Sequence, residues 1–195
     1  MKSKDLAKNT AFISLVLRVF SLLLGIGALF VPFAIGLKSV VASDSGSVIT
    51  NYGPAFSFIF GGVISTGRVT YNTNGVSVIG TIAYVLTALS LISLLAFFFL
   101  RTKKNAKWFI LGALILSLTS AILAISSHVN AATVLADSVL GRRSESVVAT
   151  MIRNTTLQFG FWGISLFGFL SASFLIASFI FDGTIDEIRA RITRR

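Results

Sequence analysis

The chain of 195 residues has no cysteine, one histidine and seven acidic residues, against seventeen lysines and arginines. Without cysteine it has no disulfides, no cysteine metal ligands and no thiol nucleophile. His128 has only the distant Asp137 and Glu145 as oxygen ligands, so we predict no metal site and no cofactor. Charged residues make up 12% of the chain, about half the roughly 25% of a soluble domain. This deficit excludes an ordinary soluble protein.

Long apolar runs account for the missing charge. We place four of them at residues 11–37, 76–100, 108–127 and 157–181. Each can cross about 30 Å of hydrocarbon, which takes roughly 20 helical residues. Because backbone groups in lipid must pair within their own segment, we predict an all-α transmembrane four-helix bundle. Residues 1–195 then form a single integral membrane domain, with loops 38–75 and 128–156 on one side and loop 101–107 and tail 182–195 on the other.

The basic residues outside the runs are unevenly divided between the two sides. Eleven lie on the side of the termini: Lys2, Lys4, Lys8, Arg101, Lys103, Lys104, Lys107, Arg189, Arg191, Arg194 and Arg195. Five lie on the other: Lys38, Arg68, Arg142, Arg143 and Arg153. By the positive-inside rule we predict both termini in the cytoplasm, and the absence of cysteine fits a bacterial plasma membrane. We assign the net charge of +10 to attraction by an anionic inner leaflet rather than by nucleic acid.

The first run has an alternative interpretation as a signal peptide. Small residues in "SVVAS" suit cleavage after Ala42. The run is longer than the 7–15 residues of a typical signal-peptide core and is interrupted by Arg18, so we favour a retained span.

The first outer loop has strand and turn patterns. "SVIT", "AFSFIF" and "RVTY" alternate with the turn signals "NYGP" and "NTNG", which predicts two or three short strands. We therefore expect a small β-like extracellular cap over the bundle. Phe56, Phe58 and Phe60 are too apolar to be left in water, so they either pack against the helix ends, which we favour, or form a binding patch.

The second outer loop reads as helical. Helix formers continue the third run to Gly141, a suitable C-cap, and Ser144 is a suitable N-cap for the next segment. We expect the third and fourth helices to protrude as a hairpin. Arg142 and Arg143 at its tip are candidates for the outer interaction patch.

Arg18 is the one charge inside the runs and needs an explanation. It shares a helix face with small or polar residues, namely Ser14, Ser21, Gly25, Ala28 and Pro32, so we predict that it faces other helices. We favour an arginine that snorkels or caps carbonyls at the inner leaflet; the alternatives are that it binds an anion or lipid headgroup, or pairs with a charge. For the pair we name Asp182, provided that the first and fourth helices are neighbours.

The remaining patterns concern packing. Ala113, Ser117 and Ala121 in the third run, and Gly168 with Ala172 in the fourth, mark close helix contacts. The tail carries the capping box Thr184-x-x-Glu187, which predicts a separate amphipathic helix on the membrane surface.

Motifs for catalysis or transport are missing. We find no HExxH, GxSxG or P-loop, and no acid in any run, so we expect no enzyme. Four spans, cytoplasmic ends, a β-like first outer loop and a protruding third helix together resemble claudin-like tetraspans in architecture. The Trp-Gly-Leu-Trp signature and cysteine pair of claudins do not occur in "YGPAFSFIFGG".

Two functions follow as hypotheses. The first is a structural or accessory tetraspan that binds a protein partner or itself. The second is an oligomeric pore, or a lipid- or anion-handling protein, that uses Arg18.

Overall fold

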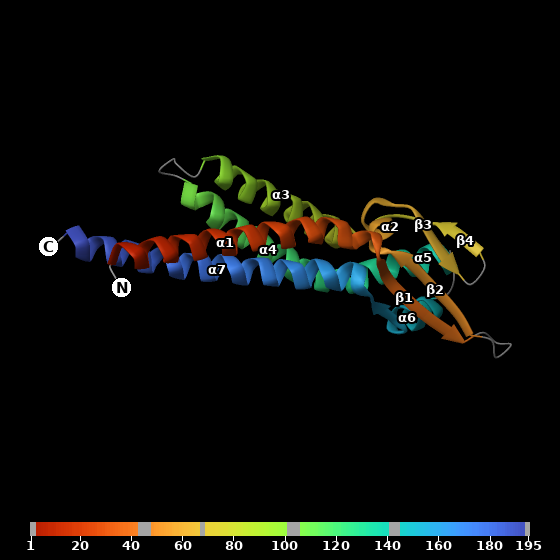
Figure 1. Cartoon of the computed structure of the whole chain (residues 1–195). Coiled ribbons are helices and arrows are strands. Elements are labelled where there is room, and N and C mark those ends of the chain that lie inside the picture. The colour runs from red at the N-terminus through yellow and green to blue at the C-terminus, as the bar shows by residue number, and fades with distance from the viewer. Residues whose placement is uncertain (1–2, 43–47, 67–68, 101–105, 141–144, 194–195) are drawn as a thin grey trace.

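Four long helices lie side by side, and the other elements form a cap at one end of them (Figure 1). The computed structural model describes residues 3–42, 48–66, 69–100, 106–140 and 145–193. The long helices are α1 (Ser3–Phe30), α3 (Val78–Leu100), α4 (Ala106–Ser126) and α7 (Phe159–Thr193). The cap contains η1 (Val31–Phe33), β1 (Ile35–Ala42), β2 (Val48–Pro54), α2 (Ala55–Phe60), β3 (Val63–Thr66), β4 (Val69–Asn72), α5 (His128–Leu140), α6 (Glu145–Arg153) and β5 (Thr155–Leu157).

The four long helices are long and apolar enough to cross a membrane, as the sequence predicts. The apolar stretches cover Lys8–Phe33, Val78–Leu100, Ala106–Ser126 and Phe159–Gly183. The first ends earlier than the predicted residue 37. Pro32 lies in the short 3-10 helix η1, and Ala34 after it is extended, so the chain enters a strand at Ile35. Proline ends a helix because it lacks the backbone donor and clashes with the preceding turn.

The bundle is built from two antiparallel helix pairs. α1 lies along α7, α3 lies along α4, and α4 also packs on α7 and so joins the pairs (Figure 1). The α4–α7 contact uses the small residues that the sequence singles out. A Cβ on Gly168 would lie 3.0 Å from the Cβ of Ala121 and 3.1 Å from the carbonyl oxygen of Ser117. The close approach therefore depends on glycine at this position.

A five-stranded antiparallel sheet lies in the cap, which confirms the predicted small sheet. Its strand order is β4-β3-β2-β1-β5. The sequence does not predict β1, β3 or β5. Residues 35–37 continue the apolar run, Val63–Thr66 lies outside the segments expected as strands, and β5 has only three residues. Strand β1 is paired on both sides, so cleavage after Ala42 would remove α1 and an interior strand together.

The segment "AFSFIF" is helix α2 and not a strand, which corrects the prediction. Pro54 precedes it in an extended conformation, and the chain then turns helically. Alternation would put Phe56, Phe58 and Phe60 on one face of a strand. The helix instead buries Phe58 with Ile59 and leaves Phe60 exposed, so the aromatic set is divided.

The second outer loop forms a helical hairpin that only partly matches the prediction. Helix α5 follows α4 after the single residue Ser127, so the third long helix is extended into the cap. Helix α6 packs on α5, but strand β5 separates it from α7. The fourth helix therefore does not protrude. The predicted tail helix is also wrong as a separate element, because α7 runs without a break to Thr193.

The cap and the bundle meet at a close contact of three segments, namely the starts of β1, α2 and α7, and glycines allow this close approach. Gly36 lies directly against Ala55, and a Cβ on Gly160 would lie 2.7 Å from the carbonyl oxygen of Ala34. Backbone bonds cross the same point: the amide of Gln158 donates to Gly36 at 2.8 Å, and that of Ala55 donates to Ala34 at 3.0 Å. These contacts tie the starts of α2 and α7 to β1.

Candidate functional site: a buried ion pair between the first and last spans

Arg18 lies inside the bundle, in the interface between α1 and α7. The residue is only 8% exposed, and its face-sharing neighbours Ser14 and Ser21 are fully buried. This confirms that the small and polar stripe of α1 faces other helices. Phe20, off the stripe, is exposed. A guanidinium in this position has lost water and needs partners from the protein.

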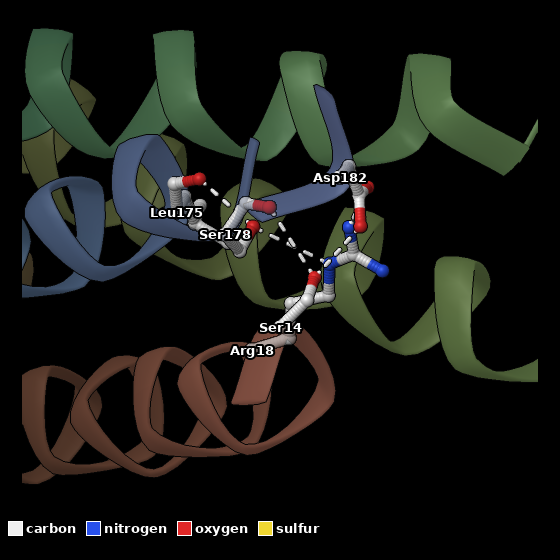
Figure 2. A network of polar contacts seen from close by, with 5 residues as sticks. All are labelled: Ser14, Arg18, Leu175, Ser178 and Asp182. Atoms are coloured by element: carbon white, nitrogen blue, oxygen red, sulfur yellow. Dashed lines mark hydrogen bonds and ion pairs between the residues drawn. The ribbon is translucent and has the colours of Figure 1, made fainter. Parts of the chain in front are cut away.

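Asp182 of α7 supplies the counter-charge. The Arg18 guanidinium donates to Asp182 Oδ2 as an ion pair, and Ser14 Oγ donates to Asp182 Oδ1 at 2.8 Å (Figure 2). The Nε of Arg18 donates to Ser178 Oγ at 3.4 Å, and Ser178 Oγ donates to the carbonyl of Leu175 at 2.8 Å. The structure thus brings together the two residues that the sequence names, in a network of five residues.

Helix geometry explains why these residues meet. Ser14 and Arg18 are four residues apart on α1, and Ser178 and Asp182 are four apart on α7, so each pair lies on one helix face. The helices are antiparallel, so the serine of each helix faces the charged residue of the other. These two reciprocal contacts fix both the rotation and the axial register of α1 against α7.

Aromatic contact completes the site from a third helix. The Cζ of Arg18 lies 4.7 Å from the ring centroid of Phe97 on α3, a cation–π distance. Phe97 is itself buried. The sequence reasoning misses Phe97 and Ser178. Their signal is weak because the chain has 18 phenylalanines and the spans are rich in serine.

The Arg18–Asp182 ion pair has no net charge, and this determines whether the site can bind a charged ligand. Two opposite charges in contact, with added hydrogen bonds, offset each other's desolvation inside a low-dielectric bundle. Arg18 does not reach out of the bundle as a snorkelling residue would. Its charge is also directed at Asp182 rather than left open to an anion. The arrangement therefore suits a structural contact that stabilises the packing of α1 on α7.

Serine and threonine hydroxyls also form hydrogen bonds between the long helices. Ser21 and Ser171 share a hydrogen bond of 2.6 Å between α1 and α7. The α3–α4 contact has two such bonds, Thr87 with Ser120 at 2.6 Å and Ser90 with Ser117 at 2.7 Å. Between α4 and α7, Ser165 donates to the carbonyl of Ala121 at 2.7 Å, next to the Gly168 contact. The sequence shows Ser117 in a small-residue stripe, but it does not show which hydroxyls meet across helices.

The predicted outer patch is not one surface. Phe58 is fully buried in the cap core, so it leaves the patch because the helical turn of α2 directs it inward. Phe56 stacks on Phe33 with ring centroids 4.9 Å apart, and Phe60 packs edge-on against Tyr84 at 5.2 Å. These rings join the ends of α1 and α3 rather than the tip of the cap. Arg142 and Arg143 lie outside the described residues.

His128 has an ordinary structural partner at the start of α5. Its Nε2 donates to the carbonyl of Thr155 at 2.8 Å, which links α5 to β5. Within the described ranges, no three histidine or acidic residues gather closely enough to hold a metal ion.

The chain matches no protein-family model, no curated protein and no solved structure. The class of the protein therefore rests on its fold alone. The four apolar helices fit a tetraspan integral membrane protein.

Proposed function

We propose that this protein is a non-enzymatic tetraspan scaffold, an accessory or self-assembling subunit that acts by contact through its cap. The observation that carries the proposal is the pairing of polar groups within the spans. Arg18 binds Asp182, and the span hydroxyls bind one another or nearby carbonyls. Polar groups engaged in this way stabilise a rigid bundle and are not free for a passing substrate.

The cap supplies a surface for such contacts. One face of the sheet is covered, and Leu37 and Ile64 on that face are buried. The opposite face presents Val40, Tyr52 and Val63, all exposed. A sheet face with exposed apolar side chains outside the spans is a candidate for a protein partner or a second copy of the chain.

Orientation and location belong to the same proposal. We place both termini in the cytoplasm of a bacterial cell and the cap outside the plasma membrane, because the basic residues favour the terminal side. The resemblance to claudins fits this arrangement in outline. The cysteine-free chain makes the orientation easy to test. A single cysteine at Thr70, exposed on β4, should react with an impermeant maleimide in intact cells, and one at Asn9 should react only after lysis. The reverse pattern would overturn the orientation.

Mass determination of the intact complex tests the scaffold proposal. The full chain is extracted from its native membrane in mild detergent, as wild type and with Tyr52→Asp. We expect a stoichiometric foreign protein or a closed homo-oligomer with the wild type, and its loss with Tyr52→Asp. Thr150→Asp, on an exposed position of α6, is the matched control and should keep the complex. A wild-type chain found only as a lipid-bound monomer would contradict the proposal.

The alternative, a pore or anion-handling protein, rests on Arg18 in its serine-lined stripe. Its test is flux through liposomes that contain Arg18→Leu/Asp182→Leu, which removes the charges together. Flux in the wild type that this variant loses while remaining folded would favour the alternative. Absence of flux from both would leave the scaffold as the supported function.

A further inference from the structure

A shallow apolar groove runs along the outer side of α1, away from the Arg18 network. Its volume is about 400 Å³. Five residues of α1 and one of α7 line it: Phe12, Ile13, Val16, Leu17, Phe20 and Phe174. The rings of Phe20 and Phe174 stack at 5.9 Å between centroids and lie across the α1–α7 contact. The groove is therefore a feature of the helix pair and not of one helix alone.

The α1 side of this groove lies within a candidate membrane span. All five α1 residues belong to the apolar stretch Lys8–Phe33, and Phe12, Ile13 and Phe20 are exposed. A groove with apolar walls at membrane depth meets acyl chains, because no water is there to fill it. Aromatic rings can pack closely along an extended chain.

A cation marks one end of the groove. Lys8 is exposed and lies four residues before Phe12, about one helical turn or about 6 Å along the axis. It is also the first residue of the apolar stretch, where a helix meets the headgroup region. A lysine at this depth can extend toward a phosphate, while the groove beneath receives the attached chain.

We propose that the groove binds one acyl chain of an anionic phospholipid, with the lipid phosphate held by Lys8. The apolar walls bind the chain, and the lysine selects the negatively charged headgroup. This site differs from the anion site considered for Arg18, which faces the opposite side of α1. It depends on the membrane-spanning helices but not on the scaffold proposal, so either can fail alone.

Lipid binding to the purified full chain tests the site. The probes are phosphatidylglycerol and phosphatidylcholine with the same acyl chains, titrated in mild detergent and counted by native mass spectrometry. We expect one phosphatidylglycerol to bind more tightly than the others. Val16→Trp fills the groove and removes the close packing of the acyl chain, so the first lipid, of either kind, should then bind no more tightly than the later ones. Lys8→Gln should weaken phosphatidylglycerol alone, by about fivefold.

Controls separate a specific site from general lipid coating. Phe99→Ala removes a ring that is highly exposed on α3 and does not line the groove, and it should leave the first binding event unchanged. Val16→Leu keeps the groove open and should bind like wild type, which guards against a folding defect at this position. Equal losses in Phe99→Ala and Val16→Trp, or wild-type binding in Val16→Trp, would overturn the site. A Lys8→Gln loss that is the same for both lipids would overturn the headgroup assignment.

Discussion

In the bundle the helices meet through small residues and hydroxyl groups, whereas the cap closes around large apolar side chains. The α3–α4 contact has Ser90 against Ser117, with Phe99 turned outward at 85% exposure. The cap core instead buries Phe58, Leu135 and Met151. The bundle also buries a few large side chains, namely Leu94, Phe97, Ile110 and Leu175, but many more of its large apolar residues are exposed, such as Phe12, Ile92 and Phe169.

The difference follows from the solvent that each region meets. Helices in lipid gain little by burying leucine or phenylalanine, because the acyl chains are equally apolar, so close packing and polar bonds provide the association. A cap in water gains from each apolar side chain removed from the surface. Because the chain has no cysteine, this core and the strand pairing hold the cap without disulfides.

The largest effect should come from breaking the bundle's ion pair on one side. Arg18→Leu leaves the Asp182 carboxylate, whose side chain is 19% exposed, without its cation and should lower the free energy of unfolding by about 3 kcal/mol or slightly more. Arg18→Leu/Asp182→Leu removes both charges and should recover most of that loss. The measurement is reversible unfolding of the full chain in bicelles.

Exchanging the charges provides the control for this pair. Arg18→Asp/Asp182→Arg should express better than either single change, because the attraction is restored with reversed polarity. Additive losses in the double variants would mean that the two residues do not stabilise each other.

The corresponding change in the cap should act through a cavity. Phe58→Ala removes a fully buried ring and should cost about 3 kcal/mol. Hydrogen exchange should accelerate in β2 and β3 while the amides of α1 and α7 remain protected. Phe60→Ala, two residues away but exposed, should cost less than about 1 kcal/mol. Equal effects of the two variants would contradict the burial of Phe58.

How far the sequence predicts each region also differs. In the bundle, lipid imposes helices, so long apolar runs locate the spans, and one small polar stripe locates the buried face of α1. Asp182 can be named as a partner because acids are rare in the chain. Serine partners cannot be named, because many serines share the spans and only the helix rotations decide which hydroxyls meet.

In the cap, local patterns compete with distant contacts. The apolar segment Ala55–Phe60 suits a strand or a helix equally, and burial of Phe58 against other elements favours the helix. Strand β5 exists because Thr156 pairs with Lys38, a contact that no pattern near Thr156 reveals. The sequence therefore predicts that a sheet exists but not its strand order.

Overpacking a helix contact should have an intermediate effect. Gly168→Val places its side chain against Ala121 and the Ser117 carbonyl, and should cost about 1–3 kcal/mol by separating α4 from α7. Gly183→Ala is the control on the same helix, since a Cβ there meets nothing within 4 Å. Both are measured by unfolding in bicelles. Gly183→Ala should gain up to about 1 kcal/mol from helix propensity, and a gain in Gly168→Val as well would show that the close contact does not limit side-chain size.

The smallest effect should come from one hydroxyl bond of the bundle. Ser90 Oγ shares a bond with Ser117 and can donate to the carbonyl of Ala113 at 2.9 Å. Ser90→Ala should cost only about 0.6 kcal/mol, because Ser117 can turn to the carbonyl of Ala113, four residues earlier on its own helix. When Arg18 is removed, by contrast, Asp182 has no second cation within four residues on its own helix to replace it. The interaction free energy of each pair is measured in a double-mutant cycle. If the Ser90–Ser117 value were as large as the Arg18–Asp182 value, hydroxyl bonds and the ion pair would stabilise the bundle equally.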